Sequence, residues 1–203
     1  RHATAIGHLN TLPDLDGAVR SEPLVLQYYD RFLPSISLQI AARSLNLDTS
    51  DIRVNLAPSV ELGSLTIGTD TQLQMNTFFY SGKLGSPSFQ VDSFYDVFTG
   101  KIPLEKYRDK IVLIGPTATG VGTPQITPIE AAMAPVLTLA HSVSSILNED
   151  FFIEPEWGAW ARTGAFLVVM LYLMLLMPRL KAGVAFVVTL LLLLSLIAAH
   201  YVL

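Results

Sequence analysis

The sequence predicts an α/β domain, a mixed sheet flanked by helices, followed by a hairpin of two transmembrane helices. Three observations carry this prediction. Strand-like and helix-like segments alternate through the first 150 residues, which is typical of layered α/β domains. All 17 acidic residues and ten of the 13 Lys and Arg lie in 1–156, giving that part a net charge of −7. The last 47 residues carry three charges, all positive, and are rich in Leu, Val and Ala.

The first half of the chain offers turn residues, one helix and two strands. Residues 1–23 are rich in Gly, Asn, Asp and Pro, which favour turns. A helix is predicted over 33–47, because Pro34 and Ser35 suit a helix start. Its apolar residues at helical spacing are expected on one face: Leu33, Ile36, Ile40 and Leu45. Strands are predicted over 65–67 and 73–80 from their apolar alternation.

The second half predicts a short helix, a buried strand and a longer helix. The short helix covers 93–99 and closes at Gly100. The apolar run 111–114, bounded by charge and then glycine, is typical of a fully buried strand, often a parallel one. The longer helix covers 134–147, with an apolar stripe at Val136, Leu139, Ala140, Val143 and Leu147. We interpret the aromatic group as core packing: Phe78, Phe79, Tyr80, Phe89, Phe94, Tyr95 and Phe98.

A glycine-rich loop follows the predicted strand 111–114 and is the candidate ligand-binding segment. Ligands often sit beyond the carboxyl ends of strands in α/β sheets. Exposed N–H groups and hydroxyls can bind an anion there. The candidate residues are Thr117, Thr119, Gly120 and Gly122. No Lys follows the glycines as in a nucleotide phosphate loop, so a tight strand-to-helix turn is the alternative interpretation.

Two carboxylates near the start of the chain have two interpretations. Asp14 and Asp16 could hold calcium, but the later ligands of a helix-loop-helix calcium site are missing. An Asp-Gly turn at Gly17, with Arg20 pairing a carboxylate, is the favoured interpretation.

The composition excludes several classes of function. The acidic balance, without clustered Lys and Arg, argues against nucleic acid as a partner. The chain has no cysteine, which excludes thiolate catalysis and Cys-ligated metal. The four His residues lie apart, so none forms a zinc-type pair, and we interpret His141 as a satisfied or partly exposed histidine. The Gly-x-Ser-x-Gly motif that holds the nucleophilic serine of many hydrolases does not occur. We therefore expect no catalytic residues, no metal, no cofactor and no enzyme activity from this chain.

The membrane anchor is predicted as helices over 157–177 and 182–203, with a turn at 178–181 and a linker at 151–156. About 20 apolar residues span the hydrocarbon core, and 182–199 lacks any charge. The first helix carries residues typical of a membrane interface, namely Trp157, Trp160 and Arg162. A buried core helix is the alternative for the run 182–199.

The charges of the turn predict the topology. Arg179 and Lys181 favour the cytoplasmic side, which places residues 1–156 outside the cytoplasm and Leu203 on the same outer side. An effector inside the cell would then need a third span. The lipid bilayer is the first expected partner.

The soluble motifs resemble those of CHASE2 domains. The stretches at 7–10 and 13–20 resemble the family's G-x-x-N and PD-x-DG-x-x-R motifs. Later blocks follow in the family's order: 37–42, 79–82, 93–100, 110–118, 127–128 and 139–147. The resemblance covers 7–150 and lacks the family's N-terminal portion, so we expect the C-terminal part of such a domain. Gly122-Thr123 stands where the family often has an Asp, and Pro135 begins a stretch that departs from its last-helix motif.

The resemblance implies an extracytoplasmic sensor domain over 1–150 of a receptor in a bacterial inner membrane. It implies a small-molecule or protein signal, a dimeric receptor, and a histidine kinase, nucleotide cyclase or Ser/Thr kinase as effector. A membrane-anchored structural or partner-binding protein with an exported assembly domain is the alternative. An exposed apolar patch without a pocket would favour it. An exported enzyme is the weakest possibility.

Overall fold

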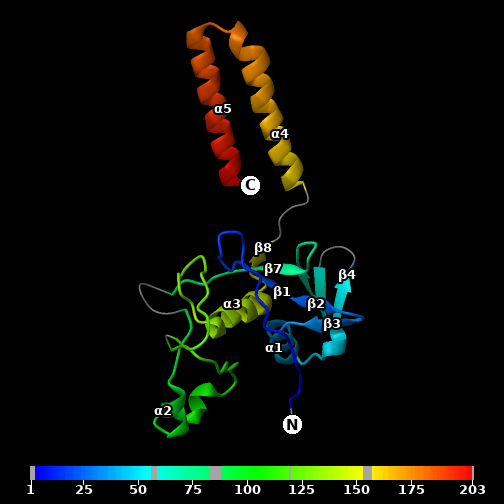
Figure 1. Cartoon of the computed structure of the whole chain (residues 1–203), viewed down its shortest axis with the longest axis vertical. Coiled ribbons are helices and arrows are strands. Elements are labelled where there is room, and N and C mark those ends of the chain that lie inside the picture. Colours follow the sequence, from blue (N-terminus) through cyan, green and yellow to red (C-terminus); the bar gives the residue numbers. More distant parts are fainter. Residues whose placement is uncertain (1–2, 56–58, 83–87, 119, 153–156, 203) are drawn as a thin grey trace. The chain divides into compact units, whose positions relative to one another are not determined.

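The structure, a computed structural model, describes residues 3–55, 59–82, 88–118, 120–152 and 157–202. The chain divides into two compact units, Arg1–Ile153 and Glu154–Leu203. The first unit combines strands and helices, and the described part of the second is helical (Figure 1). The α/β class of the first unit is therefore confirmed.

The described strands form three small antiparallel sheets, not the single mixed sheet expected from the sequence. Their orders are β1–β7–β8, β2–β3 and β4–β5–β6. The strands are β1 (Ser21–Pro23), β2 (Val25–Tyr28), β3 (Arg31–Pro34), β4 (Ile52–Asn55), β5 (Ser59–Leu62), β6 (Leu65–Gly68), β7 (Gln74–Thr77) and β8 (Phe151–Phe152). Two-residue connections join β2 to β3 and β5 to β6. Such short connections permit hairpins, whereas parallel pairing needs a long crossover.

The helices of the first unit lie close to where the sequence predicts them. They are α1 (Ile36–Ser44), α2 (Phe94–Phe98) and α3 (Pro135–Asn148), with 3-10 turns at Thr49–Asp51 and Leu104–Tyr107. The Ser35 hydroxyl caps α1 by accepting the Leu38 N–H at 3.2 Å, as N-cap serines do. Pro135 occupies the first turn of α3, where its missing N–H has no intrahelical partner to lose. The predicted strands near 65–67 and 73–80 correspond to β6 and β7.

The faces that α1 and α3 bury are not the apolar stripes that the sequence predicts. In α1, Leu33 and Leu45 flank the helix and are each 44% exposed, whereas Ser37, Leu38 and Gln39 are buried. In α3 the buried set is Thr138, His141, Ser142, Val143, Ser145 and Ile146. Only Val143 belongs to the predicted stripe. Most of these polar side chains have hydrogen-bond partners, which hydrophobic periodicity does not detect, whereas the Thr138 hydroxyl has none among the described residues.

The predicted strand at 111–114 is not formed. Ile111, Val112 and Ile114 are 46%, 51% and 78% exposed, and no strand pairs with this run among the described residues. Four apolar residues need a neighbouring strand before they can form one, and apolar composition does not supply it. Gly115 follows, and a Cβ there would lie 2.7 Å from the Val136 side chain.

Two turn predictions near the start of the chain are explained by contacts. A Cβ on Gly7 would lie 2.6 Å from the Ile36 backbone nitrogen, so only glycine fits where the first segment crosses the start of α1. Arg20 pairs with both carboxylates, at 2.5 Å to Asp14 and 2.6 Å to Asp16. This pairing, with Gly17 at φ +81°, confirms the Asp-Gly turn. The Arg20 guanidinium lowers the pKa of Asp16 to about 2.

The core of the first unit lies between α1, α3 and the strands. Its fully buried members come from both helices, two of the sheets and the residue between β1 and β2: Leu24, Leu38, Ala41, Val60, Leu62, Ile67, Met75 and Ile146. The α1 and α3 helices pack against each other (Figure 1).

The second unit is an antiparallel pair of apolar helices (Figure 1). The first is α4 (Gly158–Leu171), which continues as a π-helical turn over Tyr172–Leu176 and a 3-10 turn over Met177–Arg179; the second is α5 (Ala182–Val202). The Tyr172 hydroxyl lies 2.6 Å from the Thr189 hydroxyl and donates to the Ala185 carbonyl at 3.2 Å. These contacts join the two helices close to the turn.

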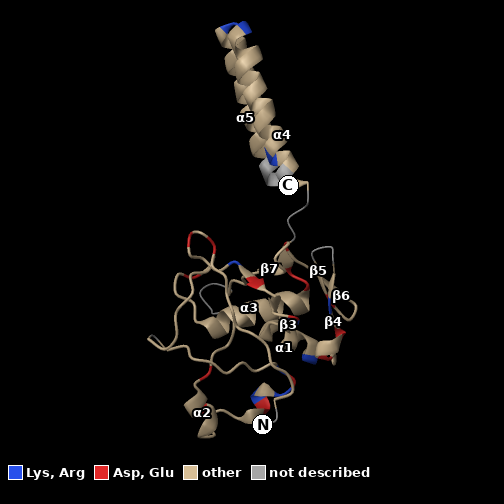
Figure 2. Cartoon of the chain, turned by 45° about the vertical axis from the view of Figure 1, so that its right-hand side comes forward, with Lys and Arg blue, Asp and Glu red and all other residues tan. Residues whose placement is uncertain are grey.

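One described helical run is long and apolar enough to cross a membrane. It spans Trp160–Arg179, with a mean hydropathy of 1.8, and 6% of its window is buried. The run Ala182–Ala198 is also apolar but shorter. In Figure 2 the helical pair is tan, with the blue of Lys and Arg only near its ends.

Candidate functional site

A pocket of about 220 Å³ opens beside the N-terminal half of α3. Three segments line it: the chain after β7, the loop before α3, and α3 itself. The lining residues are Ser81, Gly82, Ser88, Phe89, Ile129, Glu130, Met133, Leu137 and His141. The pocket therefore combines an apolar wall with hydroxyl, imidazole and carboxylate groups, as small-molecule sites commonly do.

His141 forms the buried end of this pocket. Its side chain is 1% exposed, and its Nδ1 accepts the Tyr80 N–H at 3.1 Å. Burial lowers the pKa of His141 to about 4, so the ring is neutral at pH 7 and carries its proton on Nε2. Aromatic rings surround it, with Tyr80 stacked at 5.9 Å and Phe89 edge-on at 4.8 Å. The histidine is therefore buried, with Nδ1 paired, and Nε2 has no acceptor among the described residues.

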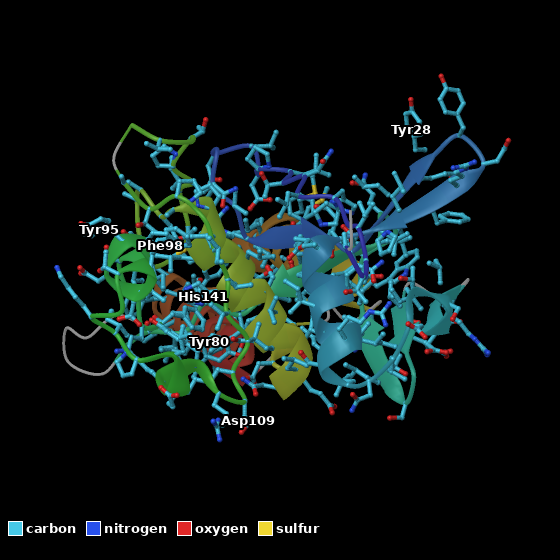
Figure 3. The ribbon with its side chains drawn as sticks, turned by 90° about the horizontal axis from the view of Figure 1, so that it is seen from below. Tyr28, Tyr80, Tyr95, Phe98, Asp109 and His141 are labelled. Atoms are coloured by element: carbon cyan, nitrogen blue, oxygen red, sulfur yellow. The ribbon has the colours of Figure 1, made fainter. Side chains whose placement is uncertain are left out.

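Tyr80 lies beside His141 (Figure 3) and joins the pocket segment to the residue that precedes β8. Its ring stacks on His141, while its hydroxyl donates to Asp150 at 2.9 Å and accepts from the Asn148 amide at 3.2 Å. Asp150 directly precedes β8, which pairs antiparallel with β7. The Asn76 amide adds a bond to the Phe152 carbonyl at 3.3 Å. The last element of the first unit is thus fixed to the segment that forms the pocket wall.

A second set of hydrogen bonds joins α3 to the same segment, residues 78–80. The Ser145 hydroxyl accepts the Phe78 N–H at 3.0 Å and lies 3.2 Å from the Phe78 carbonyl oxygen. The hydroxyl also lies 2.8 Å from the His141 carbonyl. Together with the Tyr80 contact, this fixes residues 78–80 along α3.

The interior between β1, α1 and α3 holds an acidic residue in a group of hydroxyls. Glu22 is 9% exposed, and its carboxylate accepts the Ser37 hydroxyl at 2.5 Å. The Ser35 and Ser37 hydroxyls lie 2.7 Å apart, and Ser142 lies 3.3 Å from Thr77 on the β7 side. Burial raises the pKa of Glu22, because no described cation compensates the ionised carboxylate. Sequence reasoning missed this group.

The loop predicted to bind a ligand lies away from the pocket lining. Thr117, Gly120 and Gly122 are exposed, and Thr119 lies outside the described residues. The two glycines have φ of +86° and +81°, and the Val121 N–H closes a turn onto the Ala118 carbonyl at 3.1 Å. This geometry requires glycine for the turn, and anion binding by the loop stays a prediction.

The expected interface residues occupy the ends of the helical pair. Trp157 and Trp160 are 50% and 79% exposed at the start of α4. Arg162 is exposed in the same helix, and Arg179 and Lys181 are exposed at the turn. Within the predicted linker, 151–152 form β8, and 153–156 lie outside the described residues.

A sequence signal for the pocket does exist in retrospect. His141 and Ser145 are four residues apart, so they lie on the same helix face, and both bond to residues of the 78–80 segment. The aromatic group predicted as core is divided. Phe79, Tyr80 and Phe89 surround His141, whereas Phe94, Tyr95 and Phe98 are 65–80% exposed on α2.

Comparison with known proteins identifies the family. No curated protein and no solved structure shows significant similarity to the chain. The sequence model of the CHASE2 domain matches residues 1–177, which covers the first unit and continues through α4. CHASE2 is a family of extracytoplasmic sensor domains found in signalling receptors. The match spans most of the chain, which therefore belongs to the CHASE2 domain family.

Proposed function

We propose that this chain is the non-catalytic sensory and membrane-anchor region of a dimeric bacterial signal-transduction receptor. The first unit senses a signal outside the inner membrane, and α4 and α5 cross the bilayer as a hairpin. A histidine kinase, nucleotide cyclase or Ser/Thr kinase inside the cell would receive the signal. The observation that carries the proposal is the bonding of β8 to the pocket segment, immediately before the apolar helices.

The charge distribution supports the direction of the hairpin. The turn between the helices carries Arg179 and Lys181, and basic residues in short loops remain cytoplasmic. The acidic first unit then lies outside, and Trp157 and Trp160 lie at the outer headgroups.

The contacts around Tyr80 support a route for the signal. A ligand that favours one position of His141 or Tyr80 changes the position of Asp150, because the Tyr80 hydroxyl holds that carboxylate. Asp150 precedes β8, and the chain continues from β8 towards α4. The ligand shifts the receptor only by the difference between its affinities for the two arrangements.

Membrane topology tests the proposal directly. The chain has no cysteine, so Asp30→Cys in the exposed β2–β3 turn and Leu180→Cys in the hairpin turn each provide a unique label site. A membrane-impermeant thiol reagent on intact spheroplasts should label the first variant and spare the second until the membrane is permeabilised. The unsubstituted chain is the blank. Labelling of Leu180→Cys alone in intact spheroplasts would reverse the topology and overturn the proposal.

Exposed aromatics favour a second candidate function, an exported partner-binding module. Phe94, Tyr95 and Phe98 are exposed on α2, and Tyr28 and Tyr29 form an exposed pair at the β2–β3 turn. Figure 3 labels Tyr28, Tyr95 and Phe98. Such exposed apolar groups mark interaction surfaces in other proteins. Under this alternative, Phe98→Ser would release an envelope partner captured by in vivo cross-linking, whereas a ligand in the His141 pocket would change nothing downstream.

A further inference from the structure

We infer that the His141 pocket binds a small organic cation: an ammonium group on an apolar body that also carries a hydrogen-bond acceptor. This inference rests on the proposed sensory function and specifies the class of signal. It follows from four properties of the pocket, namely its charge, its free donor, its apolar wall and its size.

The formal charge on the described lining residues favours a cation. Among the described residues that line it, Glu130 alone carries a formal charge, and no described cation pairs with its carboxylate. The backbone of Glu130 is held in place by buried Thr127, whose N–H and hydroxyl both bond to the Glu130 carbonyl, at 2.8 and 3.0 Å. The Thr127 hydroxyl also accepts the Glu130 N–H at 3.1 Å. A carboxylate or phosphate ligand would meet no described compensating charge here.

The donor is His141. Because Nδ1 accepts the Tyr80 N–H, the neutral ring carries its hydrogen on Nε2. No described group accepts that hydrogen, so a ligand hydroxyl, ether or carbonyl oxygen can do so. A buried ring in contact with three aromatic neighbours keeps this donor in a fixed orientation.

The apolar wall and the volume of the pocket limit the chemistry and the size of the ligand's apolar part. Phe89, Met133 and Leu137 provide the apolar surface, and the face of an aromatic ring attracts an ammonium group. A volume of about 220 Å³ equals the liquid volume of about seven waters. The pocket therefore fits a compound with one ring or one short branched chain and excludes larger ligands.

Tyramine is a suitable probe, because it combines an ammonium group, one ring and one hydroxyl. Titration calorimetry uses the full chain in nanodiscs of zwitterionic lipid, with empty nanodiscs as the blank. Three comparators each change one group: 4-ethylphenol lacks the ammonium, phenethylamine lacks the hydroxyl, and 4-hydroxyphenylacetate carries a carboxylate. Tyramine should bind at least tenfold more tightly than 4-ethylphenol, and 4-hydroxyphenylacetate should be the weakest.

Two variants assign the contacts. Glu130→Gln should weaken tyramine at least tenfold and leave 4-ethylphenol unchanged, whereas Glu105→Gln, an exposed carboxylate outside the pocket, is the matched control. His141→Asn keeps an acceptor for the Tyr80 N–H but loses the Nε2 donor. It should remove the advantage of tyramine over phenethylamine. Because Glu130 is exposed, its variant remains informative even where His141→Asn folds poorly.

Three results would overturn the inference: equal affinity for tyramine and 4-ethylphenol, tighter binding of 4-hydroxyphenylacetate, or no binding of any probe. These failures are separate from failure of the proposed function. Reversed cysteine labelling would overturn the sensory topology and leave tyramine binding intact. Correct labelling without tyramine binding would leave the sensor standing and remove only this ligand class.

Discussion

The two units of the chain invert the usual relation between polarity and burial. The first unit buries Glu22, Ser37 and His141 in its interior. The helical unit exposes most of its described Leu, Val and Phe side chains, with Phe166 and Phe186 at 67% and 69%. Buried polar groups are tolerated when they are hydrogen-bonded, and exposed apolar helices are tolerated when lipid surrounds them. This difference in exposed surface supports the proposal that the helical unit lies in lipid and the first unit in water.

The largest expected effect comes from a charge placed on an exposed leucine of the helical unit. Leu191 in α5 is 60% exposed, and an Arg near the centre of a spanning helix costs about 3 kcal/mol. Leu191→Arg should therefore lower the inserted fraction more than tenfold, measured by carbonate extraction of membranes. Leu104→Arg is the matched control, because Leu104 is 70% exposed in the first unit. Equal effects of the two substitutions would show that the units share one solvent.

The buried histidine predicts a loss of stability in acid. The pKa of His141 is lowered from 6.5 to about 4, so the unfolded chain binds a proton more readily than the folded one. The contribution of neutral His141 to the free energy of unfolding is fully present above pH 6.5. It falls by about 3 kcal/mol as the pH approaches 4. His141→Asn removes this contribution. Chemical unfolding at both pH values should show the wild type losing more stability than the variant, and parallel losses would contradict the assignment.

A somewhat smaller loss of stability is expected from removing the Ser145 hydroxyl, which joins α3 to residues 78–80. Ser145→Ala leaves the Phe78 N–H without its partner, at a cost of about 1–3 kcal/mol. Ser144→Ala, one residue earlier on a half-buried face, is the control and should cost much less. Urea unfolding measures both, and equal midpoints for the two variants would argue against the buried polar interior.

The smallest effect on stability is expected at Tyr80. Tyr80→Phe keeps the ring on His141 but loses the bonds to Asp150 and Asn148, which are exposed and contribute about 1 kcal/mol or less. Its effect on signalling should be larger, because the hydroxyl links the pocket segment to the residue before β8. Hydrogen exchange at residues 150–152 should rise in the variant. Unchanged exchange there would remove Tyr80 from the route.

The sequence predicts the elements better than their faces. Helix starts at Ser35 and Pro135 and the turn at Gly17 are local, because caps and turns depend on adjacent residues. The buried faces of α1 and α3 depend on hydrogen bonds between distant residues, such as the bond between Glu22 and Ser37. The run at 111–114 is apolar but has no described partner strand.

The candidate site was only partly predictable. The sequence places His141 in a helix and Tyr80 in a strand-like segment, but their stacking joins residues 61 positions apart. Glu130 has no sequence motif at all, and its place in the pocket depends on the turn that Thr127 closes. A binding loop after a strand was a reasonable expectation for an α/β sheet, and the pocket lies instead across the loop that precedes α3.

Tryptophan quenching by brominated lipids tests the central claim most directly. The chain has two tryptophans, Trp157 and Trp160, both at the start of α4, so the first unit contributes no background. The full chain in vesicles should be quenched more strongly by bromines near the headgroups than by bromines near the bilayer centre, because the hairpin begins at the interface. Absence of quenching by either lipid would contradict the account, since the helical pair would then lie in water.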